Sequence, residues 1–527
     1  MKKFFRKLFS PTTFIILILL LELAILIFGF YLIEFIFENY VPEEYSSLSF
    51  LTYIFIRFLL WIFQMIIFFR IINKYENPEY KVTWIAFMAI LPVSTTIMYL
   101  IFANHGLRKK DRRIILPTNK IQEGIFQLKE EEIDDFRYNV PLEYRGIFKY
   151  LRKTTRLSNS KDNQVTYFKN GEAFFPEFVR CLSEAKEFIL MEFFIIGEGK
   201  WWKQIESVLK QKAKEGVEIR LIYDDMGSFG LLPSSYPKQL AKFGIKCYKF
   251  NKFKPLLSGV YNNRTHRKIA VIDHKYGFTG GMNLADEYAN EIVRFGYWKD
   301  TMVKIEGRGI ANLIATFLQN YDLCTHKISD YKKYIEGEYP QYENGGYLFA
   351  FGDGPGSFDG NEQIGEQNYL NIINSAKREL WISTPYLIPT YRLTEALKNA
   401  AKRGVEVNLF VPGIPDKRVV YWMAKCDFHI LVDAGVNIYI YKPGFNHEKE
   451  CLADDIIAFV GTINFDFRSL THHFECGVDI YNDPCLKDIK EDFLEMKMQS
   501  QIVDKAYKVN GFQRFVASIL KLVRTLL

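Results

Sequence analysis

Apolar residues dominate the first hundred positions, where three long apolar runs follow one another. They cover residues 14–37, 48–72 and 82–104. A helix needs about 20 apolar residues to cross the roughly 30 Å of a bilayer core, and each run is long enough. A secretory signal peptide is disfavoured, because its apolar region would be shorter and followed by small residues. The pattern predicts a membrane region over residues 1–110 with two or three transmembrane helices.

Basic residues beside these runs bear on orientation. They stand before the first run (Lys2, Lys3, Arg6, Lys7), before the third (Arg70, Lys74, Lys81) and after it ("RKKDRR", 108–113). The positive-inside rule assigns all three groups to the cytoplasm, which three full crossings cannot satisfy. Either one run is re-entrant or the N-terminus lies outside. We expect a multi-pass protein of the cell membrane with cytoplasmic catalytic lobes, and the number of crossings stays open. Glu22, inside the first run, is expected at an interface or paired between helices.

A polar, charge-rich segment follows, and the chain then nearly repeats itself. We interpret residues 111–145 as a linker with no more than a short helix. After it, "AKEFILMEFFI" (185–195) resembles "AKRELWISTPYL" (376–387), and "LKQKAKEGVEIRLIYD" (209–224) resembles "LKNAAKRGVEVNLFVP" (397–412). The offsets are 376 − 185 = 191 and 397 − 209 = 188. Two homologous lobes are predicted, over 146–335 and 336–527.

The rhythm inside each lobe is a helix, a glycine and a β-branched strand. Such alternation favours an α/β sandwich with a largely parallel sheet. The predicted fold is therefore two like α/β/α lobes about a pseudo-twofold axis, preceded by transmembrane helices. The tail at 512–527 has Phe515, Ile519, Leu522 and Leu526 on one helical face. This amphipathic helix would either lie on the membrane surface or cap the second lobe, and the pattern favours neither.

Each lobe contains a short apolar strand that begins with polar residues of the same types. "HRKIAVID" holds His266, Lys268 and Asp273, and "HEKECLAD" holds His447, Lys449 and Asp454. Side chains alternate along a strand, so His and Lys share one face. Asn283 and Asn464 each follow their histidine by 17 residues (283 − 266 and 464 − 447). A lone histidine on a strand is more often a core residue, but two matched copies in repeated lobes favour a site.

These residue types suit the cleavage of a phosphodiester. Of two facing imidazoles, one can attack while the other donates a proton to the leaving group. Two lysines and two asparagines offer donors for the phosphate oxygens, whose charge must be held through the transition state. The sequence has no His/Asp/Glu cluster at metal-ligand spacing and no phosphate-binding loop of the G-x-x-x-x-G-K-[ST] type. We therefore expect neither a metal nor another cofactor.

The composition bears on the compartment of the protein and on whether it binds nucleic acid. The net charge is +7, and the seven cysteines are scattered without a C-x-x-C pair. This cysteine usage predicts free thiols in a reducing compartment. No basic tract interleaved with aromatic residues is present, which together with the apolar runs argues against a nuclease or another nucleic-acid partner. His472 and His473 are neighbours that would face opposite ways on a strand, so structural roles are favoured for them.

At the paired H-x-K-x-x-x-x-D motifs the chain resembles the phospholipase D superfamily, and within it the bacterial cardiolipin synthases. Shared local runs are "RLIYDDMGS" (220–228), "GGMNLADEY" (280–288), "WKDTMVKIEG" (298–307), "WISTPYLIP" (381–389) and "NFDFRSLTHHFE" (464–475). The resemblance covers roughly residues 80–500. Thr462 stands where the family usually has serine, which keeps the hydroxyl. The run at 14–37 is additional to the family's usual pair of helices.

The resemblance implies that two phosphatidylglycerols give cardiolipin and glycerol through a phosphohistidine. His266 would attack phosphorus, and His447 would protonate the glycerol and then act as the base for the second lipid. Lys268, Lys449, Asn283 and Asn464 would hold the phosphate oxygens. Asp273 and Asp454 complete the motifs and are expected to support the strands through ion pairs. Asp300 and Glu475 follow the histidines by 34 (300 − 266) and 28 (475 − 447) residues, and either could orient an imidazole.

Three rival functions remain at this stage. A phospholipase D that uses water, or a synthase that uses another alcohol, would share the site. A nuclease of the superfamily is less favoured, and a non-catalytic scaffold would be expected to lose at least one histidine. The expected partners are phosphatidylglycerol and cardiolipin in the bilayer. A homo-oligomer is compatible with the pattern, which does not determine the oligomeric state.

Overall fold

The computed structural model describes residues 11–42, 45, 48–103, 106–252, 262–343, 345–355, 362–505, 507, 509–522 and 524–526. Within the first helix, several side chains between 11 and 30 are also outside the description. The chain divides into two units, and each is described by itself. The smaller contains the first hundred residues, and the larger contains the two lobes. The basic residues before Pro11, on which the predicted orientation depends in part, lie outside the described residues.

The described residues of the smaller unit form the helices α2 (Pro11–Tyr40), α3 (Ser49–Asn73), α4 (Pro78–Ile90) and α5 (Pro92–Phe102). Among the described residues, only α3 is both long and apolar enough to cross a bilayer, as judged by length and composition. The α2 helix has 30 residues, several of whose side chains are outside the description. One described helix does not test a count of two or three crossings, so that count stays a prediction.

The third apolar run does not form the single long helix that its length predicts. It divides at Leu91 into α4 and α5, of 13 and 11 residues. At 1.5 Å per residue each is about 20 Å long or less, which is short of the bilayer core. Pro92 explains the break, because it lacks an N–H and fits the first turn of a new helix. Glu22 of α2 accepts hydrogen bonds from Val93 N (3.0 Å) and Ser94 N (2.9 Å), so it caps α5.

In the larger unit the predicted duplication is visible in the order of the strands. The lobe 1 sheet has the order β1-β8-β6-β5-β2-β3-β4, and the lobe 2 sheet has β9-β16-β15-β14-β10-β11-β12-β17. Each strand of the lobe 1 sheet has an equivalent in the lobe 2 sheet, and β17 is an addition at the edge. Lobe 1 strands are β1 (Gln164–Phe168), β2 (Phe188–Phe193), β3 (Glu218–Asp224), β4 (Lys246–Phe250), β5 (Ile269–Ile272), β6 (Tyr276–Gly280), β7 (Tyr297–Lys299) and β8 (Met302–Glu306). Lobe 2 strands are β9 (Tyr347–Asp353), β10 (Glu379–Ser383), β11 (Glu406–Pro412), β12 (Asn437–Tyr441), β13 (Gly444–Asn446), β14 (Glu450–Ala453), β15 (Ile457–Gly461), β16 (Glu475–Tyr481) and β17 (Ser500–Ile502).

The sheets are mixed, so the expectation of a largely parallel sheet is wrong. In lobe 1 only the pairs β2–β3 and β3–β4 are parallel, and β2–β5, β5–β6, β6–β8 and β1–β8 are antiparallel. The reason is local: a tight turn after Asp273 folds β5 directly onto β6, and a turn after Asp454 does the same for β14 and β15. Consecutive strands joined by such turns must run antiparallel.

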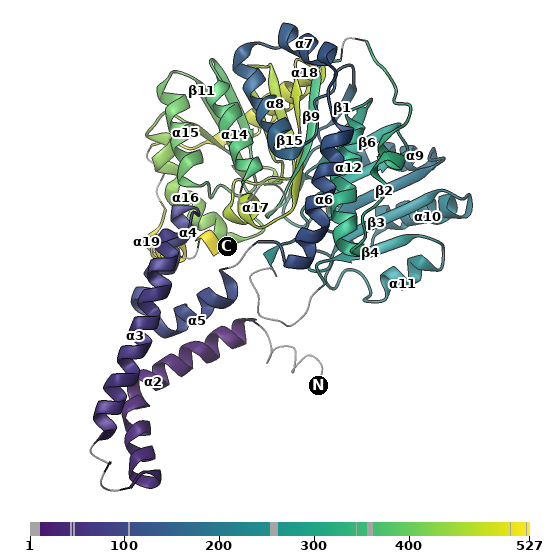
Figure 1. The fold of residues 1–527 in the computed structure, drawn as a ribbon. Coiled ribbons are helices and arrows are strands. Elements are labelled where there is room, and N and C mark those ends of the chain that lie inside the picture. Colours follow the sequence, from purple (N-terminus) through teal and green to yellow (C-terminus); the bar gives the residue numbers. More distant parts are fainter. Residues whose placement is uncertain are drawn as a thin grey trace. The chain divides into compact units, whose positions relative to one another are not determined.

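Helices cover both faces of the lobe 1 sheet. Alternate residues of β2 point to opposite sides: Ile189 and Met191 join a core with α9 (Gly171–Ser183) and α10 (Lys200–Lys214), and Leu190 joins a core with α12 (Ile310–Thr325). The α12 helix packs against β2 and β5 and also against β9 of lobe 2 (Figure 1). The remaining helices are α11 (Tyr236–Ala241), α13 (Tyr331–Ile335), α14 (Ile364–Ser375), α15 (Tyr391–Lys402), α16 (Arg418–Val432), α17 (Phe467–Thr471), α18 (Cys485–Met498) and α19 (Gly511–Lys521).

The segment predicted as a linker is instead part of the folded unit. It contains most of α6 (Lys109–Ile125), all of α7 (Glu130–Asn139) and the start of α8 (Leu142–Thr155). Ile115, Val140 and Tyr144 are buried in the core that both lobes share. Only a few apolar residues in this charged segment make these core contacts. The pattern of apolar and polar residues therefore did not predict that the segment is folded.

Candidate active site

The two H-x-K segments are positioned by backbone pairing between the lobes. Strand β13, which ends just before His447, runs parallel to β7, which ends just before Asp300. Thr265, just before His266, forms a parallel bridge with Phe474, just before Glu475. His447 N donates to Lys299 O (2.7 Å), and His266 N donates to Phe474 O (2.8 Å). The same arrangement therefore occurs twice, and each histidine lies beside a carboxylate of the other lobe.

Both imidazoles donate Nδ1–H to these carboxylates. His266 Nδ1 lies 2.9 and 3.1 Å from the two oxygens of Glu475 and 3.1 Å from Thr462 O. His447 Nδ1 lies 2.6 Å from Asp300 Oδ2. Acceptors at Nδ1 fix the tautomer and leave Nε2 for chemistry. Asp300 and Glu475 were both candidate orienting groups, and the structure places Glu475 on His266 and Asp300 on His447.

The two orienting carboxylates differ in their surroundings. Glu475 accepts hydrogen bonds from the hydroxyls of Thr462 and Ser469, the latter at 2.6 Å. Burial raises the pKa of Glu475, but His266 and His473 outweigh it and hold that pKa well below its usual value. Asp300 accepts from Thr301 N at 2.9 Å. Burial raises the pKa of Asp300 to about 6, against the lowering effect of Lys449. Glu475 is thus the more firmly ionised of the two.

Lys268 and Lys449 are both buried near the carboxylates of Glu475 and Asp300. The Lys268 ammonium donates to His266 O at 2.7 Å, and the Lys449 ammonium donates to His447 O. Burial lowers the pKa of Lys268 to about 7 and that of Lys449 to about 8, and both Glu475 and Asp300 oppose these shifts. Each lysine therefore interacts with the carboxylates of both lobes, which brings the two half-sites together around one pair of ammonium groups.

The imidazoles themselves are neutral at pH 7. Burial lowers the pKa of His266 to about 3, against the raising effect of Glu475. Burial, followed by the charges of Lys449, Lys268 and Lys417, lowers the pKa of His447 well below its usual value. A neutral imidazole with a free Nε2 can act as a nucleophile or base. An anionic phosphate between the lysines would offset their charge and raise the pKa of both rings.

Comparison with known proteins decides the family. The family described as cardiolipin synthase, phospholipase D-like domain, matches residues 178–320 and 369–497. Cardiolipin synthase 2 of Bacillus anthracis is 32% identical over 86% of this chain and 88% of its own length. The chain belongs to the cardiolipin synthase family. Membership makes it an enzyme of the phosphatidyltransferase class.

Two further matches extend the comparison. A Streptococcus mutans protein without a functional name is 41% identical over 87% of this chain and 98% of its own length. The crystal structure of a phosphatidylserine synthase from Haemophilus influenzae shares the fold, with a TM-score of 0.55 and 14% identity over 73% of this chain and all of that one. The phospholipase D-like fold therefore spans both lobes.

Asn283 and Asn464 lie in unlike surroundings, although their positions in the cardiolipin synthase motifs match. Asn283 Oδ1 accepts from Ile195 N (2.9 Å), and its Nδ2 donates to the hydroxyl of Tyr288 (2.6 Å). One amide N–H is left for a phosphate oxygen. Asn464 is buried, and its Oδ1 makes no hydrogen bond to the described residues. Asn464 is therefore the freer of the two, and phosphate binding by either stays a prediction.

Asp273 and Asp454 form none of the expected ion pairs with the residues that the structure describes, and they lie at the far end of the strands from the histidines. The Asp273 carboxylate accepts from three consecutive backbone amides, Lys186, Glu187 and Phe188, at 2.8–2.9 Å. Asp454 binds the equivalent amides of Lys377, Arg378 and Glu379 at 2.7–3.0 Å. These contacts anchor the β5–β6 and β14–β15 turns to the starts of β2 and β10, because a carboxylate satisfies several adjacent N–H groups. We therefore expect their role to be structural support.

Asp273→Asn is therefore expected to lower stability and to spare the chemistry. The amide would turn an N–H donor toward three backbone donors, which costs about 2 kcal/mol of the free energy of unfolding. Thermal unfolding, together with the specific activity of the folded fraction, measures the two effects separately. Asp433→Asn, at an exposed position of lobe 2, is the matched control. A large loss of activity in well-folded Asp273→Asn protein would instead place this carboxylate in the reaction.

Gly281 allows Asp300 to reach His447. A Cβ at position 281 would lie 2.0 Å from Asp300 Oδ1, so any side chain there displaces the carboxylate. Thr462 takes the equivalent place in lobe 2 and uses its hydroxyl to hold Glu475. We expect Gly281→Ala to reduce transfer about 100-fold, since a misplacement of about 1 Å has that effect on oriented groups. Gly124→Ala, where a Cβ meets nothing within 4 Å, is the control. Equal activity of the two variants would contradict the orienting role of Asp300.

Aromatic side chains line both histidines, and the paired motifs did not predict them. Phe194 lies 5.2 Å from the His266 ring, and Phe445, Trp298 and Tyr288 lie 5.3, 5.5 and 5.8 Å from the His447 ring. These walls exclude water and account for the burial that shifts the pKa values. A signal existed: "WKD" and "FNH" each place an aromatic residue two positions before a site residue.

Two clusters in the described part of the chain have the geometry to hold a metal ion. One consists of His266, His473 and Glu475, and it overlaps the candidate nucleophile. The ring of His473 lies 5.4 Å from that of His266, so His473 is a neighbour of the candidate site. The other cluster consists of Glu448, Glu450 and Asp492. The Lys299 ammonium lies 2.7 Å from Glu448 and 2.6 Å from Asp492, so a cation already neutralises part of that cluster.

Proposed function

We propose that the protein is a membrane-bound cardiolipin synthase that transfers a phosphatidyl group from one phosphatidylglycerol to another and releases glycerol. The observation that carries this proposal is the pair of histidines, each bound by a carboxylate of the opposite lobe, around two buried lysines. That arrangement provides one nucleophile, one proton carrier and a binding charge for a single phosphodiester. Membership of the cardiolipin synthase family supports phosphatidylglycerol as donor and acceptor.

In the first half-reaction the Nε2 lone pair of His266 forms a bond to phosphorus. The bond between phosphorus and the glycerol oxygen breaks, and that oxygen takes the Nε2 proton of His447. The product on the protein is a phosphatidyl-histidine whose ring keeps its Nδ1–H on Glu475. Because Glu475 is firmly ionised, it stabilises the positive charge that this ring acquires.

In the second half-reaction a hydroxyl of another phosphatidylglycerol gives its proton to His447 Nε2. The hydroxyl oxygen forms the new bond to phosphorus as the bond to His266 Nε2 breaks. Cardiolipin leaves, His266 is again a neutral imidazole, and His447 again carries a proton. His447 first takes this proton from solvent when the donor lipid binds, because the bound phosphate offsets the charges of Lys449 and Lys268. His266 is the nucleophile by family convention, and the contrast between Glu475 and Asp300 supports that assignment.

Lys268 and Lys449 are expected to make substrate capture sensitive to alkaline pH. Their pKa values, about 7 and about 8, are lowered from that of an ordinary lysine, so the binding charge is present below this range and is lost above it. We expect kcat/KM to fall about tenfold per pH unit above pH 8. The decline of kcat should occur at higher pH, because bound phosphate keeps the lysines charged. Profiles of both parameters between pH 6 and 9.5 test this, and a flat kcat/KM would contradict it.

The membrane arrangement belongs to the same proposal. Two crossings, by α2 and α3, would put the N-terminus and the basic segments at 70–81 and 108–113 on one side, which the positive-inside rule makes cytoplasmic. The broken run of α4 and α5 would then be re-entrant, because neither helix is long enough to cross. The catalytic lobes would be cytoplasmic.

The function is tested with purified full-length protein in vesicles that contain radiolabelled phosphatidylglycerol as the only phospholipid. Equal amounts of cardiolipin and glycerol are the expected products. Phosphatidate without cardiolipin would identify a phospholipase D that uses water. Transfer only after the addition of a different alcohol would identify another synthase. The variant Lys402→Glu, at an exposed position on α15, is prepared in the same way. It should give the same products as the unmodified protein.

A further inference from the structure

The C-terminal helix α19 presents an apolar face that the fold leaves uncovered. Its inner side packs on α16 through Ala517 and Leu520, which join Met423 in a small core. Four large apolar residues point outward: Phe512 (69% exposed), Phe515 (64%), Ile519 (53%) and Leu522 (43%). Their spacing of three and four residues places them on one side of the helix. The helix therefore caps lobe 2 with one face and offers the other to a partner.

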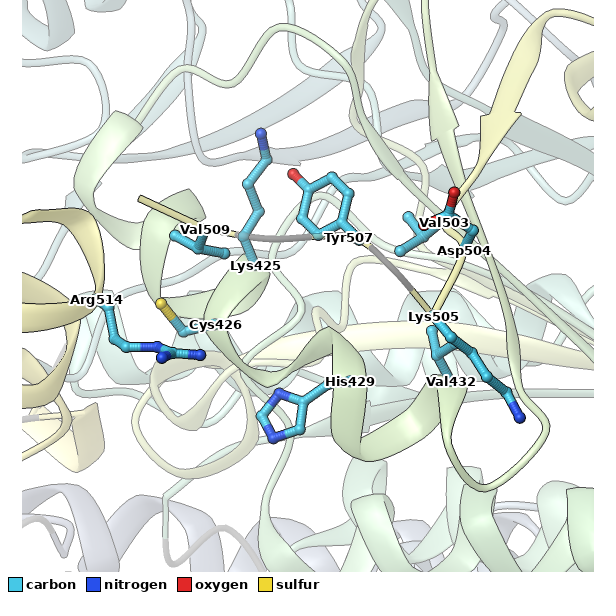
Figure 2. A pocket seen from close by; sticks show the side chains of 10 residues that line it. All are labelled: Lys425, Cys426, His429, Val432, Val503, Asp504, Lys505, Tyr507, Val509 and Arg514. Carbon is cyan, nitrogen blue, oxygen red and sulfur yellow. The ribbon is translucent and has the colours of Figure 1, made fainter. Parts of the chain in front are cut away.

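A basic cavity lies beside this helix, between α16 and the segment that leads into α19. It has a volume of about 60 Å³, and ten residues line it (Figure 2). Four of them are basic and one is acidic: Lys425, His429, Lys505, Arg514 and Asp504. Figure 2 shows the guanidinium of Arg514 directed toward Cys426 and His429. Among the described residues, Lys425, Lys505 and Arg514 form no ion pair, whereas neighbouring Lys521 is paired with Asp427.

An excess of unpaired basic groups next to an exposed apolar face favours one kind of partner. An amphipathic helix with basic flanks lies in the headgroup region of a bilayer, with its apolar side among the acyl chains. Each basic residue at such a surface adds attraction to anionic lipids. A protein partner would more often meet a face without a concentrated positive charge at its edge. The chemistry of both features thus matches an anionic phospholipid.

We infer that α19 docks on the membrane surface and that the cavity lined by Arg514, His429, Lys425 and Lys505 binds the phosphate of an anionic phospholipid. Phe512, Phe515, Ile519 and Leu522 insert among acyl chains, and the basic residues contact the headgroup. This site is separate from the paired histidines and has no part in the transfer reaction. It holds lobe 2 against the lipid surface through contacts independent of the N-terminal helices.

Hydrogen–deuterium exchange of the full-length protein in nanodiscs tests this inference without requiring turnover. Three preparations are compared: phosphatidylcholine alone, phosphatidylcholine with phosphatidylserine, and phosphatidylcholine with inorganic phosphate in solution. We expect amides of 418–432 and 509–522 to exchange about tenfold more slowly with phosphatidylserine than in the other two. Arg514→Glu combined with Lys425→Glu should abolish the difference. Lys402→Glu combined with Lys238→Glu, an equal charge change at exposed positions of α15 and α11, should leave it unchanged.

Four results would overturn the inference. Equal exchange in all three preparations would show that α19 does not sense anionic lipid. Slower exchange with inorganic phosphate alone would identify a site for a soluble anion. Protection that survives the double charge reversal would exclude the cavity as the lipid site. Protection that depends on protein concentration in phosphatidylcholine would identify a second copy as the partner.

Discussion

His266→Asn is expected to reduce the formation of cardiolipin from phosphatidylglycerol by at least about 10⁴-fold. Asparagine is close to histidine in size and can still hydrogen-bond Glu475, but it has no Nε2 lone pair to form the bond to phosphorus. The local structure should persist, because the backbone N–H at this position still donates to Phe474 O. Release of labelled glycerol and formation of cardiolipin would be measured together, and both should be lost.

His274→Asn is the matched control for this substitution. His274 lies in the turn after β5, at the far end of this strand from His266, and its Nε2 contacts Tyr334 O at 2.9 Å. This variant should keep its activity within a fewfold. Substantial glycerol release by well-folded His266→Asn protein would mean that another group attacks phosphorus.

His447→Asn is expected to cost about 10²–10⁴-fold with phosphatidylglycerol, the usual contribution of a general acid or base. The loss should depend on the leaving group. Glycerol leaves as an alkoxide unless it is protonated, whereas p-nitrophenol leaves readily without a proton. With a phosphatidyl p-nitrophenol substrate, His447→Asn should therefore release p-nitrophenol in an initial burst at a near-normal rate, and subsequent turnover should be slow.

The same substrate separates the two histidines. His266→Asn should give no burst. This variant lacks the group that attacks phosphorus, and that attack is needed whichever alcohol leaves. If the two variants exchanged these behaviours, His447 would be the nucleophile and His266 the proton donor. Loss of the burst in both variants would contradict a division of roles between them.

The residues of the site could be predicted from the sequence because the chain is duplicated. His266 and Lys268 recur as His447 and Lys449 in matched lobes, and a strand's period of two places each pair on one face. The pairing of carboxylates with histidines could not be predicted in the same way. Glu475 binds His266 and Asp300 binds His447 because the two lobes exchange strand edges, and that exchange is a property of the assembled fold.

Other differences have local physical causes. The carboxylate of Asp273 was expected in an ion pair, but three adjacent backbone amides at the start of β2 offer a better match. Helix α6 begins with five consecutive charged residues, 109–113, and still folds onto the core through residues such as Ile115. In the apolar run at 82–104, a single proline was enough to divide one expected helix into two.

The most direct test of the account is to find the covalent intermediate. The full-length protein would be mixed with labelled phosphatidylglycerol, quenched without acid within one turnover, digested and analysed by mass spectrometry. The account predicts a phosphatidyl group on His266, in a larger amount in His447→Asn protein supplied with the p-nitrophenol substrate. A phosphatidyl group on His447 alone, or rapid transfer without any modified histidine, would contradict it.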